Sequence, residues 1–171
     1  MELMDIINRR FSVRKFDGRK PEQEKLNAVL LAGNMAPTAK NQQPQRIYVL
    51  QGDEALAKLD TLTHCRYGAG TVLLFTYNTK EDWQNPKEEG VHSGVEDVSI
   101  VATHMMLRAA ELDLDTCWCN FFWNTELDKA FGLPDYERSV LIMPIGYAAE
   151  DAEPAPMHRN KKRLDDIVKY L

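Results

Sequence analysis

The sequence predicts a single α+β domain spanning residues 1–171, in which a sheet is flanked by helices. Two observations lead to this prediction: segments with helical periodicity alternate with short β-branched runs, and the connections between them are long. A sheet covered by helices is one of the stable layer arrangements of a globular domain. The length also fits one domain, because single domains commonly contain ~100–200 residues.

Helices and strands alternate through the first half of the chain. A helix is expected over 2–10 and a second over 22–33, where Pro21 precedes the helix and Gly33 ends it. The run 70–77 is apolar and β-branched, as expected of a buried central strand. The other elements expected here are a polar loop at 35–44, a strand at 46–50 and a helix near 53–62.

The second half is expected to contain one long buried helix, over 95–112. This segment is apolar on most faces, which predicts burial in a core or at a subunit interface, and His104 within it is expected to be a core histidine. The charged segment 80–90 is predicted to be an exposed, mobile loop. The remaining elements expected are a short helix at 126–131 ended by Gly132, a strand at 139–147, an extended tail at 149–156 and a possible short helix within 165–171.

Composition narrows the class of protein. A formal net charge of −5 argues against general binding to nucleic acid or to an anionic membrane surface, because both need an extended basic field. No apolar run approaches the ~20 residues of a membrane span, and no secretory signal is recognised. The three cysteines show no repeated Cys-x-x-Cys spacing, so a reducing, cytoplasmic location is expected.

Two basic clusters stand near opposite ends of this acidic chain, at 9–15 and 159–163. In an extended segment Arg10, Ser12 and Arg14 share one side, while Arg9 and Lys15 point the other way as solvated charge. Arginine suits phosphate because its planar fork donates two parallel hydrogen bonds, so the clusters are predicted to meet around one small phosphate. Charge spacing alone fits a solvated helix end equally well.

Two further segments are candidates for binding a flat ligand. The 36–44 loop is dense in amides and hydroxyls, which suit the mixed edge of a heterocycle, although turn chemistry alone also explains its Asn and Pro residues. The aromatic segment 116–123 could lie beside a cofactor or simply belong to the core. No metal site is predicted, because Cys-x-Cys offers too few ligands, and adjacent residues such as His64 and Cys65 rarely form a nucleophile–base pair.

Taken together, these segments resemble the nitroreductase family of flavin enzymes. The matching motifs occur in family order and cover nearly the whole chain: Arg10–Phe16, Ala36–Pro44, Gly94–Leu114, Thr116–Trp118, Pro144–Tyr147 and Lys161–Leu164. The resemblance implies a central, mostly antiparallel sheet, a tightly interlocked homodimer, and FMN bound at the subunit interface.

The resemblance also assigns roles to residues. Arg10, Lys161 and Arg163 are expected to grip the FMN phosphate, with Ser12 on the phosphate or ribityl side and Phe11 in the same cofactor-binding segment. Arg14 is expected at the pyrimidine edge of the ring, where a cation stabilises charge that develops on reduction. The residues expected to approach the cofactor from the partner subunit are Pro37, Thr38, Ala39 and Asn41, and those expected near flavin N5 and the ring edge are Cys119 and Asn120.

This chain departs from the family pattern at two positions. Gln45 stands where the family loop usually has Trp, and Asn120 stands where Gly is common near N5. Asn120 is expected to narrow the approach to the ring, unless the match is displaced by one residue. The chain is short for the family, so the insertion that covers the substrate is expected to be reduced. The segment 80–90 is the remaining candidate for a lid over the substrate.

The function implied is an FMN-dependent oxidoreductase that works by ping-pong exchange. It would take hydride from NADH or NADPH and reduce a small-molecule acceptor such as a nitroaromatic or a quinone. No catalytic side chain is assigned, because the flavin carries the redox chemistry. The alternatives are a flavin-binding module or sensor with little turnover, and an oligomeric scaffold whose basic clusters bind another phosphate ligand.

Overall fold

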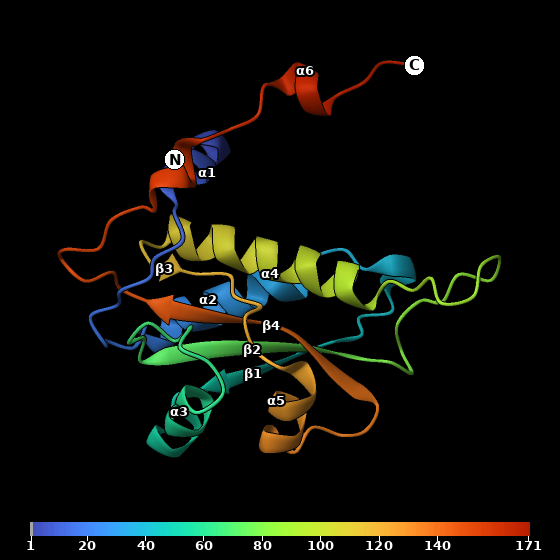
Figure 1. Cartoon of the computed structure of the whole chain (residues 1–171), viewed down its shortest axis with the longest axis horizontal. Helices are drawn as coiled ribbons and strands as arrows, with labels where there is room; N and C mark the ends of the chain where they lie inside the picture. The colour runs from blue at the N-terminus through green and yellow to red at the C-terminus, as the bar shows by residue number, and fades with distance from the viewer. Residues whose placement is uncertain (1) are drawn as a thin grey trace.

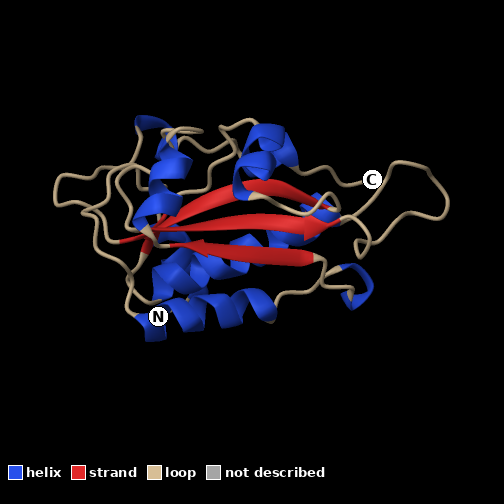
Figure 2. Ribbon diagram, turned by 90° about the horizontal axis from the view of Figure 1, so that it is seen from below, coloured by secondary structure: helices blue, strands red, loops and turns tan. Residues whose placement is uncertain are grey.

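The computed structural model describes residues 2–171 as a three-layered domain (Figure 1). Helices α2 (Gln23–Asn34) and α4 (Gly94–Glu111) cover one face of a sheet. Helices α3 (Asp53–Asp60) and α5 (Asn124–Phe131) cover the other. Figure 2 shows the sheet between these two helical layers. The predicted α+β class is therefore confirmed.

The sheet has four strands in the order β1-β2-β4-β3. Their bounds are Gln45–Leu50 for β1, Thr71–Asn78 for β2, Asp115–Thr116 for β3 and Glu137–Gly146 for β4. All three pairings are antiparallel, as the family resemblance implied. The long connections predicted from the sequence are needed because neighbouring strands β2 and β4 are separated by α4, β3 and α5.

The central strand β2 is buried on both faces, which explains its continuous apolar sequence. Leu73 and Phe75 pack against α2 and α4, whereas Val72 and Leu74 pack toward α3 and α5. This alternation follows from the two-residue period of a strand. Two hydrophobic layers therefore hold the sheet between its helices.

Helix α4 buries one face and exposes the other. Val98, Val101 and Met105 are fully buried, but Ile100 and His104 are exposed. The prediction that His104 is a core histidine was wrong, because position 104 falls on the side of the helix that faces away from the sheet. Its ring Nδ1 lies 2.9 Å from the Ile100 carbonyl oxygen of the preceding turn.

Glycine ends one of the two helices as expected. Gly132 follows α5 with a left-handed φ of 63°, a common way for a helix to end. Gly33 has a different role, since α2 continues to Asn34. A Cβ at Gly33 would lie 2.5 Å from the Met105 sulfur, so glycine there permits the close approach of α2 and α4.

The segments outside the layers differ in how they attach. The short helix α1 (Leu3–Arg9) and the 3₁₀ turn η2 (Pro156–Arg159) lie side by side, and α6 (Leu164–Ile167) projects beyond the body (Figure 1). The segment 80–90 was predicted to be an exposed loop, but Asp82 within it is buried. The Asp82 carboxylate lies 2.7 Å from Nδ1 of the His92 ring. None of the helices formed by residues 2–171 is long and apolar enough to cross a membrane.

Candidate functional site

The segment that follows α1 is extended and inserted between two other parts of the chain. Val13 donates its backbone N–H to the Thr116 carbonyl at 3.1 Å, and Phe16 donates to the Tyr67 carbonyl at 2.9 Å. Val13 and Phe16 are buried. Their apolar side chains therefore fix the segment and leave the intervening Arg14 exposed.

The cations of this segment fall into two groups. Arg9 pairs with Asp113 at 2.7 Å and also donates to the Ala110 carbonyl at the end of α4. Lys15 pairs with Asp151. The prediction that Arg9 and Lys15 are merely solvated was therefore wrong, because both are engaged by acidic residues distant in sequence.

Arg10 and Arg14 behave differently from their neighbours. Within residues 2–171, neither has a carboxylate at ion-pairing distance, and Arg14 makes only a long contact of 3.4 Å to the Ser12 carbonyl. Cations held in place without an acidic partner are available to bind an external anion.

Arg10 and the basic cluster of the tail meet at one depression, here called the basic hollow. Its volume is about 240 Å³, and it is lined by Ile7, Asn8, Arg10, His158, Arg159 and Lys161. The Phe11 and His158 rings, 6.3 Å apart in an edge-on arrangement, link the two segments. The sequence prediction that folding brings the clusters together is thus correct for Arg10 and Lys161.

Arg163 lies outside the basic hollow. Its side chain is 81% exposed and stands 3.4 Å from Asp165, at the start of the projecting helix α6. The hollow instead includes Arg159 and His158, which the sequence reasoning did not assign to the site. Arg159 belongs to the same basic cluster in the sequence, so its charge was a usable signal, whereas nothing singled out His158.

A second depression on the other side of Arg10 is less suited to an anion. It contains Arg9 but also Asp113 and Asp115, so the charges within it largely compensate one another. Burial raises the pKa of Asp115, and the hydrogen bond from the Ala148 N–H opposes this shift. Phosphate chemistry therefore favours the basic hollow.

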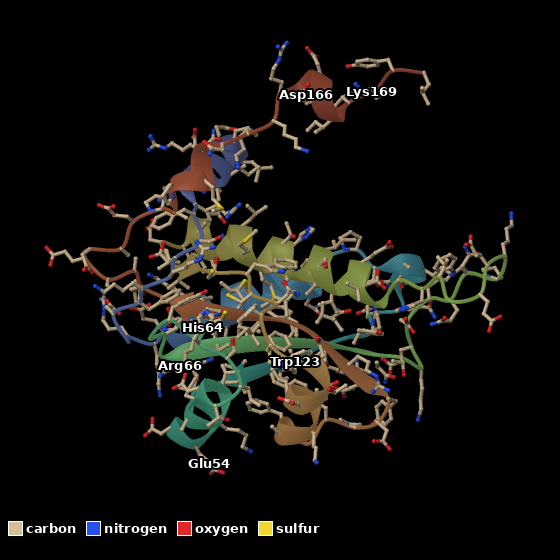
Figure 3. The ribbon with its side chains drawn as sticks, viewed as in Figure 1. Glu54, His64, Arg66, Trp123, Asp166 and Lys169 are labelled. Carbon is tan, nitrogen blue, oxygen red and sulfur yellow. The ribbon has the colours of Figure 1, made fainter. Side chains whose placement is uncertain are left out.

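The segment after β3 borders an apolar depression, here called the aromatic hollow. It has a volume of about 350 Å³ and is lined by Leu62, Thr63, His64, Asn120, Phe121, Phe122 and Trp123. The Thr63 hydroxyl donates to the Phe121 carbonyl at 2.7 Å, and the His64 and Phe121 rings are 5.4 Å apart. Figure 3 labels His64 and Trp123, which come from these two connections beside the sheet.

Asn120 does not extend freely into this hollow. Its amide oxygen accepts from the Trp118 indole N–H at 2.7 Å, and its amide nitrogen donates to the Val140 carbonyl at 2.7 Å. Cys119 is buried behind it and pairs its backbone with Ile142. The side chain that replaces the usual glycine therefore braces its own segment against β4.

The 36–44 loop lies far from the basic hollow. Ala39 donates its N–H to Asp97 in the first turn of α4, whereas Arg9 binds Ala110 in the last turn. The two contacts are about 20 Å apart along the helix axis, at 1.5 Å per residue. In this loop Thr38 accepts from the Gln43 N–H at 3.1 Å, and Pro37 and Asn41 are exposed.

Comparison with known proteins gives a family match. Residues 7–67 and 66–147 match the model of the nitroreductase family. The chain belongs to the nitroreductase family. The match covers the extended segment, the 36–44 loop, α4 and the strands of the sheet.

Solved nitroreductase-family structures share the whole fold. A nitroreductase family protein from Clostridium difficile is 34% identical, with a TM-score of 0.92 over 99% of this chain and 98% of that one. A nitroreductase from Exiguobacterium sibiricum, solved in complex with FMN, is 21% identical with a TM-score of 0.84 over 100% of this chain and 98% of that one, which shows the fold alone.

A curated relative comes from Methanothermobacter thermautotrophicus and is provisionally named NADH dehydrogenase/NAD(P)H nitroreductase. It is 24% identical over an alignment of 159 residues, and the alignment covers 88% of this chain and 80% of the relative.

The residues present fit the cofactor of a nitroreductase-family flavoprotein. The basic hollow offers Arg10, Arg159 and Lys161 to a phosphate, and the aromatic hollow offers apolar rings to a flat ligand. Within the described part of the chain, no cluster of His, Cys, Asp and Glu has the arrangement of a metal site. The cations and rings of these two hollows have the chemistry that an organic phosphate with a flat ring would need.

Proposed function

We propose that this chain is an FMN-dependent oxidoreductase that uses NADH or NADPH to reduce a small-molecule acceptor such as a nitroaromatic or a quinone. The observation that carries the proposal is the convergence of Arg10 and Lys161 on the basic hollow, in a chain of the nitroreductase family. The FMN complex of a structural neighbour supports the choice of flavin.

Arg10 and Lys161 are proposed to hold the FMN phosphate, with Arg159 as an additional cation. Ser12 is half-buried two residues after Arg10, and it forms a β-bridge with Thr116. Ser12 is proposed to bind the phosphate or ribityl part, and Phe11 to shape the wall. Arg163 remains a proposed member of this set, although its exposed position makes it the weakest.

The ring system is proposed to lie along the segment from Cys119 to Phe121. FMN, when bound, supplies a ring that accepts and donates electron pairs as hydride. Arg14 is proposed to stabilise negative charge at the pyrimidine edge. Asn120 fixes the backbone of its segment through hydrogen bonds with Trp118 and Val140. It is thereby proposed to determine how closely a substrate approaches the flavin ring.

A homodimer is proposed to complete the site. The 36–44 loop and Arg9, the residue before Arg10, are anchored at opposite ends of α4, so Pro37, Thr38, Ala39 and Asn41 are proposed to reach the cofactor of the partner subunit. The projecting end of the chain also exposes apolar side chains, as expected of a segment that packs on a second copy. These are Leu164, Ile167, Val168, Tyr170 and Leu171.

The first experiment measures FMN binding and reduction. Purified protein mixed with FMN is expected to become yellow and, without oxygen, to bleach on addition of NADH or NADPH. Arg10→Ala combined with Lys161→Ala is expected to weaken FMN binding by on the order of 100-fold or more, because each cation makes a charge-assisted contact. The matched control is Arg9→Ala with Lys15→Ala, since these neighbouring cations are already paired. Protein that takes up no FMN, or equal affinity in both double variants, would refute the assignment.

A second candidate function is a flavin-binding module or sensor with little turnover. The bracing of Asn120 favours it, because this side chain occupies a position where the family commonly has none. Stopped-flow reduction distinguishes the two functions. Bound FMN that resists both NADH and NADPH supports the module, and rapid bleaching supports the oxidoreductase.

A further inference from the structure

Three buried cysteines gather on the α3 and α5 side of the sheet: Cys65, Cys117 and Cys119. Their exposed fractions are 3%, 2% and 6%. The sulfur atoms of Cys117 and Cys119 are 3.6 Å apart, and both thiols are free. The thiol groups of this pair take no part in the proposed reaction, to which Cys119 would contribute only its backbone.

The backbone holds the two thiols on the same side of their segment. Cys117 donates its N–H to the Pro144 carbonyl at 3.2 Å, and Cys119 exchanges two backbone hydrogen bonds with Ile142, each 3.0 Å long. Side chains two positions apart in an extended segment point the same way. The short distance between the sulfurs therefore follows from the fold of the segment.

The surroundings of the two thiols are unequal. The Cys119 thiol donates toward Cys117 and lowers the Cys117 pKa, and the positive charge of Arg14 and the Ser12 hydroxyl lower it further against the opposing effect of burial. The same hydrogen bond, together with burial, raises the pKa of Cys119, which keeps its proton. Because thiolates are the reactive form, Cys117 is the better nucleophile of the two.

To form a disulfide, the two sulfur atoms must approach each other from 3.6 Å, with bending of the segment between them. A disulfide needs an S–S distance of about 2.05 Å and Cα atoms about 4.4–6.8 Å apart. Two residues of extended chain span about 6.6 Å, which is near the upper limit of that range. The bond would therefore pull on its segment, and disulfides of this kind are readily reduced.

We propose that Cys117 and Cys119 form a redox-active dithiol that hydrogen peroxide oxidises to an intrachain disulfide. The Cys117 thiolate attacks a peroxide oxygen, the O–O bond breaks, and the departing hydroxide takes a proton to become water. Cys117 is then a sulfenic acid. The Cys119 sulfur attacks it, the S–S bond forms, the S–O bond breaks, and a second water leaves with the Cys119 proton. Two thiols are oxidised and one peroxide is reduced to two waters.

The burial of the pair selects its oxidant. With exposed fractions of only 2% and 6%, the two thiols are expected to react with an oxidant as small as hydrogen peroxide and not with a bulky aromatic disulfide reagent. This chemistry needs no flavin, so it can be tested on the chain without FMN.

The test uses the reduced full chain, freed of reductant and treated with peroxide. Intact mass analysis and peptide mapping are expected to show the loss of two hydrogens in a cross-link between Cys117 and Cys119, reversed by dithiothreitol. Cys65→Ser is expected to behave as the parent chain does, while Cys117→Ser and Cys119→Ser do not form the cross-link. Cys119→Ser is also expected to trap a sulfenic acid on Cys117, seen as one added oxygen atom in the intact mass.

Two results would overturn the proposal. One is a peroxide-induced cross-link that requires Cys65, and the other is a parent chain whose thiols stay reduced or pass to sulfinic acid without a cross-link. Circular dichroism of each serine variant checks that it is folded before oxidation.

Discussion

The buried carboxylate of Asp97 accepts a hydrogen bond of 2.8 Å from the backbone N–H of Ala39. Its other oxygen accepts from the Ser93 hydroxyl at 2.7 Å. The loop that Asp97 holds contains three strained positions of positive φ, Lys40, Asn41 and Gln43. One side chain of α4 therefore fixes a loop whose backbone is unfavourable by itself.

Asp97→Ala is expected to destabilise the protein by about 2–3 kcal/mol, because it leaves a part-buried N–H and a buried hydroxyl without their charged acceptor. Urea unfolding measures this change. Glu96→Ala is the matched control, since Glu96 is the adjacent acid on the exposed side of the same helical turn. Equal loss in both variants would mean that the carboxylate of Asp97 does not hold the loop.

Arg9→Ala is expected to lower stability by about 0.5–1 kcal/mol, because Arg9 binds the last turn of α4, where a cation also interacts favourably with the helix dipole. Arg10→Ala is expected to leave stability nearly unchanged and to weaken FMN binding. Thermal unfolding without FMN and FMN titration separate the two residues. The interpretation fails if Arg9→Ala weakens FMN binding as much as Arg10→Ala does.

Asn120→Gly is expected to cost about 1–2 kcal/mol, since two side-chain hydrogen bonds are lost and glycine adds backbone freedom. It is also expected to change the rate at which NADH or NADPH reduces bound FMN. Asn124→Ala is the control, because Asn124 likewise donates to a β4 carbonyl, at Ser139. A reduction rate that changes equally in both variants would assign the effect to general destabilisation.

The pKa of Asp115 provides a prediction for the pH dependence of stability. Burial raises this pKa in the folded protein, so the stability that Asp115 contributes is present below its unfolded pKa of about 3.9 and is lost as pH rises through the folded value. Asp115→Asn removes this titration while retaining an acceptor for the Ala148 N–H. The stability of the variant relative to the parent chain is therefore expected to be greater at pH 7 than at pH 3. A difference that is constant with pH, or that has the opposite sign, contradicts this.

Much of the fold could be predicted from local pattern. The strand at 70–77 was recognisable because burial on both faces leaves an uninterrupted apolar run, and Gly132 marked the end of α5 through its left-handed conformation. Gly33 shows the limit of this reasoning. Its role depends on Met105, more than seventy positions away, and no local rule reveals that contact.

Only part of the candidate site could be predicted, because it too depends on contacts between residues that are distant in the sequence. Arg10 and Lys161 line the same hollow because one end of the chain packs beside the other. Both could be selected from the sequence because they belong to its two basic clusters. The partners that engage Arg9 and Lys15 lie at Asp113 and Asp151, so only the folded structure could separate paired cations from available ones. The role of Asp97 was not predicted, because nothing in the sequence of an apolar helix indicates that one of its acidic residues binds a distant loop.

The anchoring of the 36–44 loop and of Arg9 at opposite ends of α4 has a consequence for mixtures of chains. In the proposed homodimer, each cofactor contacts Arg10 of one chain and the loop of the other. A chain altered at Arg10 and a chain altered at Asp97 would each assemble only defective sites when alone. Mixed together, they would form dimers in which one site carries both defects and the other carries neither. Activity would thus return by complementation, in up to about half of the sites of each mixed dimer.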